Sequence, residues 1–215
     1  MIGTMKKFTQ TSQLGNKMNK SVSVLLSTAA LLIATGNIAN AATPGAYLGG
    51  GLGLSAYEPV SDAQMKTDGG LGGRAFAGYN FNRYFGLEGA YSTFYKTTYL
   101  LNDYQNLAID YSLNALSFVA KGYLPLSENN TTNLYGLLGV AQSFADINAK
   151  YHQTSIFSDS DTGVVPVLGL GASYEMNQHF TTSLECSFFG KKDADANHFG
   201  IQQAALVTLN LAYKI

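Results

Sequence analysis

The last nine residues of the chain alternate between two kinds of side chain. Every second residue is apolar and the residues between are smaller or polar; the apolar positions are Val207, Leu209, Leu211, Tyr213 and Ile215. In a β-strand, successive side chains point to opposite faces, so this period of two predicts a strand with one apolar face.

The same alternation recurs along the chain. It defines eight segments: 46–57, 70–81, 84–96, 111–124, 133–145, 164–175, 179–189 and 205–215. Each is about 10 to 14 residues long, which suits a tilted strand that crosses a membrane. The pattern predicts an all-β fold, an eight-stranded antiparallel up-and-down transmembrane β-barrel.

The connections between these segments alternate in length. Three are short or moderate (82–83, 125–132 and 176–178), and four are longer (58–69, 97–110, 146–163 and 190–204). Outer-membrane barrels have short turns on the periplasmic side and long loops outside the cell. A soluble lipocalin-like barrel also has eight strands, but it would not normally alternate loop lengths so regularly.

Four charged residues lie in the middle of predicted strands. Arg74, Glu88, Lys121 and Glu185 fall on the face opposite the apolar one. Because a charge facing lipid costs about 2–4 kcal/mol at the membrane midplane, we expect all four to face the lumen. Glu88 and Lys121 are on neighbouring strands at similar depth and are expected to pair, since an unpartnered buried charge is costly.

Aromatic residues gather near both ends of the strands, which is typical of the girdles at the two membrane interfaces. The short-turn ends carry Tyr79, Phe81, Tyr84, Phe85, Tyr123, Tyr174, Phe180 and Tyr213. The long-loop ends carry Tyr57, Phe94, Tyr95, Phe144 and Phe188.

The beginning of the chain predicts export. A basic start at Met18-Asn19-Lys20 precedes an apolar run from Val22 to Ala34, and Ala39-Asn40-Ala41 forms an A-x-A cleavage site. These are the parts of a secretory signal peptide. We therefore expect residues 1–41 to be a signal peptide with an upstream extension, and residues 42–215 to be the barrel domain.

Composition agrees with export to a membrane. Only 13% of the residues are charged, and the four basic residues before Ala42 would leave with the signal peptide, so the remaining chain is acidic. A net negative charge argues against nucleic acid as a partner. The single cysteine, Cys186, cannot form an internal disulfide, and no apolar run after Ala41 is long enough for a transmembrane helix.

Three segments resemble a known family. The stretch from Gly78 to Tyr91, the stretch from Gly45 to Gly50, and the terminal strand with its aromatic Tyr213 resemble the small OmpA-like and OmpX-like outer-membrane barrels. That family usually ends in Phe, where this chain has Ile215. The resemblance implies a cell outer membrane location in a Gram-negative bacterium. It also implies a terminal strand read by the barrel-assembly machinery, and contact with periplasmic chaperones, outer-membrane lipid and lipopolysaccharide.

The candidate chemistry is sparse. The three histidines, His152, His179 and His198, fall in predicted loops or turns without the spacing of metal ligands or a positioned nucleophile. We therefore expect no catalytic, cofactor-binding or metal site. The expected role is structural, or surface interaction through the long loops with a host or other ligand; the alternatives are a small low-conductance pore and an outer-membrane lipid-modifying enzyme.

Overall fold

The computed structural model describes residues 44–57, 64–65, 69–100, 107–126, 131–151, 154–193 and 200–215. The predicted signal peptide lies outside these residues. No helix in the described part of the chain is long and apolar enough to span a membrane.

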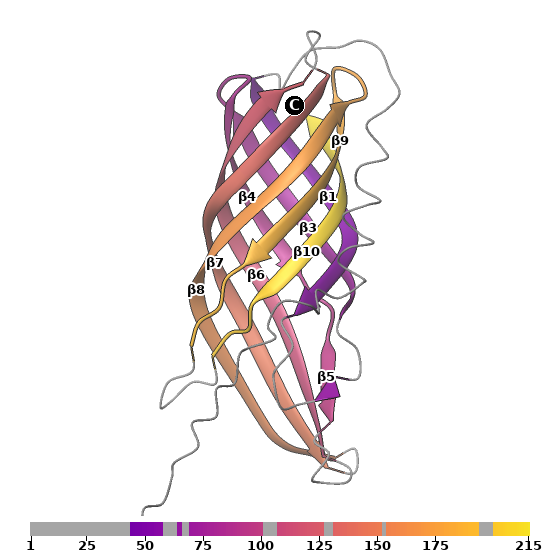
Figure 1. The fold of residues 1–215 in the computed structure, drawn as a ribbon, viewed down its shortest axis with the longest axis vertical. Helices are drawn as coiled ribbons and strands as arrows, with labels where there is room; N and C mark the ends of the chain where they lie inside the picture. The colour runs from indigo at the N-terminus through magenta and orange to yellow at the C-terminus, as the bar shows by residue number, and fades with distance from the viewer. Residues whose placement is uncertain are drawn as a thin grey trace, which may run out of the picture. The chain divides into compact units, whose positions relative to one another are not determined.

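Eight antiparallel strands of the described chain form a closed ring (Figure 1). They are β1 (Gly45–Tyr57), β3 (Gly69–Asn80), β4 (Phe85–Thr93), β6 (Leu107–Pro125), β7 (Thr132–Tyr151), β8 (Thr154–Glu175), β9 (Phe180–Phe189) and β10 (Ala204–Lys214). Each strand pairs with its neighbours along the chain, and β10 closes the ring by pairing with both β9 and β1. The predicted eight-stranded barrel is confirmed.

Asparagine side chains build two of the short turns. In the β3–β4 turn, Asn82 Oδ1 accepts hydrogen bonds from the backbone N–H groups of Tyr84 and Phe85, at 2.8 and 2.9 Å. Asn177 repeats this arrangement between β8 and β9. Such local bonds fix a tight reversal. These turns lie at the same end of the barrel as the C-terminus (Figure 1).

At the opposite end, the structure corrects the prediction of two long loops. The predicted loop 146–163 is mostly a hairpin, because β7 and β8 stay paired up to Tyr151 and Thr154. The predicted loop 97–110 contains β5 (Thr97–Leu100) and the start of β6, and β5 also pairs with the short β2 (Gln64–Met65). We call β2, β5 and the ends of β6, β7 and β8 (107–113, 144–151 and 154–163) the distal sheet; in Figure 1 the long strands run past the rest of the barrel.

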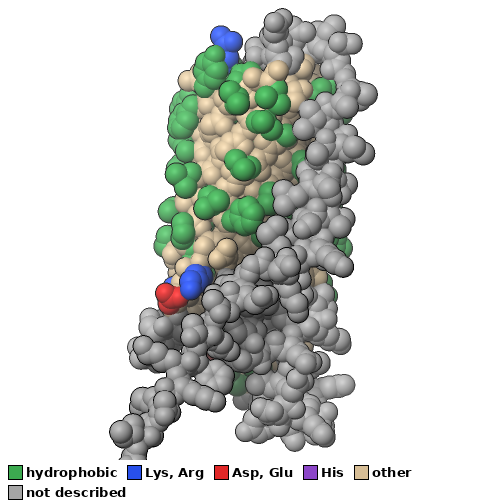
Figure 2. All heavy atoms as spheres, viewed as in Figure 1, with side chains coloured by type: hydrophobic (Ala, Val, Ile, Leu, Met, Phe, Trp, Pro, Cys, Tyr) green, Lys and Arg blue, Asp and Glu red, His purple; other side chains and the backbone are tan. Residues whose placement is uncertain are grey.

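The wall of the barrel exposes its apolar side chains. Leu52 and Leu71 are 77% and 76% exposed, whereas Ser55 and Tyr57, on the opposite face of β1, are buried. On the face shown in Figure 2, hydrophobic side chains are spread over the wall, and the visible charged side chains lie toward its two ends. A soluble barrel would bury this apolar face, so the wall is built to contact lipid.

The interior near the distal sheet is apolar. Tyr57 and Phe94, predicted to belong to an interfacial girdle, are buried inside the barrel instead. Their rings pack on each other, and Phe94 also makes an edge contact with Phe189 at 5.1 Å between ring centroids. Tyr57 lies ten residues after Tyr47 on β1, and an even separation on a strand means the same, inward face.

Removing the terminal strand tests the importance of ring closure. Deleting Val207 to Ile215 leaves one edge of β1 and one edge of β9 unpaired, and each unpaired backbone group in lipid costs several kcal/mol. The truncated chain should not form a membrane-inserted barrel, measured as loss of the mobility shift between unboiled and boiled samples on a gel. The Ile215→Phe variant should insert as well as the original. A truncated chain that still showed the shift in membranes would refute the closing role of β10.

Candidate functional site

Four charged side chains meet inside the barrel. Arg74 comes from β3, Glu88 from β4, Lys121 from β6 and Glu185 from β9. Each lies at an inward position of its strand, and their side chains are at most 7% exposed. The structure thus brings all four predicted lumen charges into one cluster, which we call the charge cluster.

Each carboxylate in the charge cluster contacts both cations. Lys121 Nζ lies 2.6 Å from Glu88 Oε2 and 3.2 Å from Glu185 Oε2. Arg74 forms ion pairs with Oε1 of the same two glutamates. Two positive and two negative groups therefore balance, which offsets the cost of removing charges from water.

Three hydroxyl groups also donate hydrogen bonds to the carboxylate oxygens of Glu88 and Glu185. Tyr47 donates a hydrogen bond to Glu88 Oε2 at 3.0 Å, and Tyr135 donates to Glu185 Oε2 at 2.9 Å. Ser187 donates to Glu185 Oε1 at 2.8 Å. Sequence analysis missed these three residues, although each shares the inward face of its strand.

Two glycines leave room for the tyrosines that hold the glutamates. A Cβ atom added to Gly78 would collide with the Tyr47 ring, and one added to Gly171 would collide with the Tyr135 ring. In a narrow barrel, a large inward side chain needs a small residue on the neighbouring strand. The aromatic rings also contact the cations, since Lys121 Nζ lies 4.7 Å from the centre of the Tyr135 ring.

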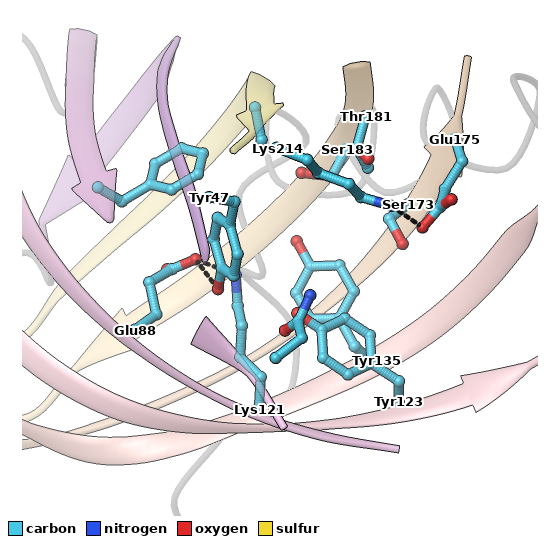
Figure 3. Close-up of a pocket in the computed structure, with 13 residues that line it drawn as sticks. Tyr47, Glu88, Lys121, Tyr123, Tyr135, Ser173, Glu175, Thr181, Ser183 and Lys214 are labelled. Atoms are coloured by element: carbon cyan, nitrogen blue, oxygen red, sulfur yellow. Dashed lines mark hydrogen bonds and ion pairs between the residues drawn. The ribbon is translucent and has the colours of Figure 1, made fainter. Parts of the chain in front are cut away.

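The charge cluster separates two parts of the lumen. Toward the short turns lies a polar cavity of about 50 Å³, lined by residues that include Glu88, Lys121, Glu175 and Lys214 (Figure 3). Toward the distal sheet lies a space of only about 10 Å³, followed by the apolar interior. At the level of the charge cluster, the described side chains fill the lumen across its width.

The predicted assembly residues lie on the outer wall. Leu209, Leu211, Tyr213 and Ile215 are exposed, and Val207 is half-buried. Tyr213 packs against Phe180 and stacks on His179, at centroid distances of 5.4 and 5.8 Å. His152 and His198 lie outside the described residues, and no group of potential metal ligands is found among the residues that are described.

A second charged group lies on the distal sheet. Asp110 accepts hydrogen bonds from Lys150 Nζ at 2.9 Å and Thr98 Oγ1 at 2.8 Å, and forms an ion pair with Lys96 at 3.1 Å. Burial alone would raise the pKa of Asp110, but these three partners outweigh it and lower the pKa to about 2. The carboxylate therefore ties β5, β6 and β7 together while it is ionised.

The fold, the apolar wall and the buried charges define an integral outer-membrane β-barrel. The family model described as "Outer membrane protein beta-barrel domain" matches residues 25–213, so the chain belongs to that family. The resemblance and the outer-membrane location predicted from the sequence are thereby confirmed.

Individual proteins that are similar to this chain support the family assignment. The chain is 28% identical over 172 residues to outer membrane protein A of Shigella flexneri, covering 78% of this chain and 48% of that protein. Among solved structures, it resembles Neisserial surface protein A (TM-score 0.57, 12% identity) and Ail of Yersinia pestis (TM-score 0.50, 16% identity). Those matches cover 79% and 80% of this chain, and 97% and 99% of the respective structures. The chain thus spans less than half of its matched curated relative.

A double-mutant cycle tests the charge cluster. Glu88→Ala leaves two cations facing one carboxylate and should destabilise the barrel by about 3–5 kcal/mol in bilayer or detergent unfolding. Adding Lys121→Ala restores the charge balance and should recover part of the loss. Lys214→Ala is the matched control, because Lys214 pairs with Glu175 and its loss should not rescue Glu88→Ala. Strict additivity of the first pair would disprove the coupling.

Acid should loosen the distal sheet. The pKa of Asp110 is lowered from 3.8 to about 2, so its stabilising effect is complete above pH 4 and is lost as pH falls toward 2. The loss is at most about 2 kcal/mol, reduced by the solvent exposure of the two lysines. Pepsin cleavage within 107–113 and 144–151 should rise over this pH range relative to Asp110→Asn. If pepsin cleavage depended on pH equally in the unmodified protein and in Asp110→Asn, ionised Asp110 would not stabilise the distal sheet.

Proposed function

We propose that this protein is a closed barrel that acts as a scaffold, holding the distal sheet outside the cell for contact with other molecules. One observation carries the proposal: the charge cluster and the apolar interior close the described lumen, whereas β6, β7 and β8 continue as a paired sheet beyond the barrel. Binding residues commonly lie on segments displayed by a rigid scaffold.

The free edge of β8 suggests the kind of partner. β9 pairs with β8 only from Val167 to Glu175. Gly190 and Lys192 donate hydrogen bonds to the carbonyl oxygens of Pro166 and Thr162, and no described strand pairs with 154–160 on the side opposite β7. An open strand edge offers backbone donors and acceptors to an incoming extended segment. Polypeptide is therefore the favoured ligand of the distal sheet.

A sulfated glycan is a weaker candidate. Ail of Yersinia pestis has been solved in complex with the heparin analogue sucrose octasulfate. Here the described lysines of the distal region are accompanied by a similar number of described carboxylates: Lys96, Lys150, Lys191 and Lys192 against Asp110, Asp146, Asp159, Asp161 and Asp193. Several of these form ion pairs with one another, which reduces the attraction for a polyanion.

The pore alternative has one supporting feature, the cavities on the two sides of the charge cluster. Conduction would require the ion pairs to exchange and the apolar interior above them to move aside. The enzyme alternative has less support, because the relatives are outer membrane proteins and the cluster carboxylates already contact cations. Outer-membrane lipid, lipopolysaccharide, chaperones and the assembly machinery remain expected partners of the wall and of β10.

Shortening the hairpin tests the display role. Replacing residues 148–158 by a two-residue turn joins Ile147 to Asp159, which face each other across β7 and β8. The barrel should still insert and show heat modifiability, because the removed residues lie beyond the lipid-facing wall. Adhesion of expressing cells to host-cell monolayers should fall to the level of cells without the protein.

Two matched measurements make this test decisive. Asp146→Asn keeps the length of the hairpin and should retain adhesion. Addition of sucrose octasulfate should not compete if the ligand is a polypeptide. Full adhesion by the shortened barrel would refute the display role, and competition by the sulfated sugar would replace polypeptide with glycan as the ligand.

A further inference from the structure

The polar cavity on the short-turn side of the charge cluster is large enough for several water molecules. Its volume is about 50 Å³, and one buried water needs roughly 10–15 Å³ of such space. Its lining is polar as well as aromatic, with Ser173, Thr181 and Ser183 opposite Tyr47 (Figure 3).

Buried polar atoms in this half of the lumen need hydrogen-bond partners. Asn80 Oδ1, both amide atoms of Asn133, Thr181 Oγ1 and Asn210 Oδ1 have none among the residues that the structure describes. Asn80, which lines the cavity, is only 6% exposed. Each buried polar atom left unpaired costs about 1–3 kcal/mol. Thr181 also lines the cavity, so a dry chamber would leave the atoms of Asn80 and Thr181 unpaired, whereas water inside it satisfies them.

The register places these atoms on one side of the charge cluster. Asn210 faces Ser183, two residues closer to the short turns than the pair of Thr208 and Glu185. Asn133 faces Ser173 near the same end of β7 and β8. These atoms therefore lie on the same side of the charge cluster as the cavity, and of the four residues that carry them Asn80 and Thr181 line it.

The other half of the lumen has the opposite character. The buried side chains packed there are mainly apolar, among them Val119, Leu137, Val165, Val167, Phe189 and Leu206. Among the residues described on this side, the buried side-chain atoms without a partner are Ser143 Oγ and, at the charge cluster itself, Arg74 Nε. Small apolar spaces stay dry, so this layer seals the barrel against water.

An ion pair lies at the end of the polar cavity that is nearer the short turns. Lys214 Nζ is 2.6 Å from Glu175 Oε1, and both residues line the cavity (Figure 3). Glu175 and Lys214 belong to the short-turn ends of β8 and β10. The cavity therefore lies next to the periplasmic opening, and the charge cluster closes the end of the cavity that is farther from the short turns.

We propose that this half of the lumen is a hydrated chamber that admits water and water-sized polar solutes from the periplasm only. The chamber ends at Glu88 and Lys121, and the apolar layer beyond them blocks passage to the outside. The barrel is thus a cup that is wet on one side and not a channel. The display role of the distal sheet does not depend on this property, so the two can fail separately.

Cysteine accessibility tests the chamber directly. In a Cys186→Ser background, Ser173→Cys places one thiol in the chamber and Ser143→Cys places one in the apolar layer; Ser143 is fully buried. The probe is Ag⁺, a small thiol-reactive ion, applied to either side of vesicles in which protease cleavage has established the barrel orientation. Thiols that remain are counted by alkylation after unfolding.

The chamber predicts a one-sided result. The thiol at 173 should react from the short-turn side on the order of 10-fold or more faster than the thiol at 143, which reacts only when the barrel opens. From the distal side, both should react slowly. Heat modifiability confirms that each variant is folded. Equal rates for the two thiols, no reaction of either, or faster reaction at 173 from the distal side would overturn the proposal.

Discussion

The structure depends on one constraint: in lipid, no backbone N–H or C=O group can be left without a hydrogen-bond partner. Closing the sheet between β1 and β10 meets this constraint, because the terminal strand then has a partner on each side. Eight strands make a ring whose interior is just wide enough for side chains. Closure therefore determines what the lumen can contain, and it makes any lumen charge a buried charge.

The charge cluster follows from this narrow interior. Arg74 and Lys121 each contact Glu88 and Glu185, so four strands are tied together across the lumen rather than only along the wall. Gly78 and Gly171 provide the space in which Tyr47 and Tyr135 complete the hydrogen bonding. The two halves of the lumen then differ, polar toward the short turns and apolar toward the distal sheet. A barrel filled in this way is suited to hold a displayed sheet in place.

The sequence alone predicted the features that depend on the alternation of apolar and polar residues along each strand. The lipid-facing wall and the inward position of Arg74 follow from a period of two and the cost of charge in lipid. The sequence could not show that Glu185 on β9 contacts residues of β3 and β6. These strands are not neighbours in the ring, and an alternating pattern gives no information about contacts across the lumen. The distal sheet was missed because its outward residues, such as Asp146 and Lys150, are polar. Outside the membrane a paired strand needs no apolar face, so its sequence looks like that of a loop.

Single-channel recording of the unmodified protein in a planar bilayer tests the central claim most directly. The charge cluster and the apolar layer together close the described lumen, so the account predicts a flat current with no resolved opening steps across a wide voltage range. The Glu88→Ala and Lys121→Ala double variant should also stay closed, because the apolar layer is untouched. Discrete openings in the unmodified protein whose frequency changes in the double variant would contradict the account and identify the barrel as a gated pore.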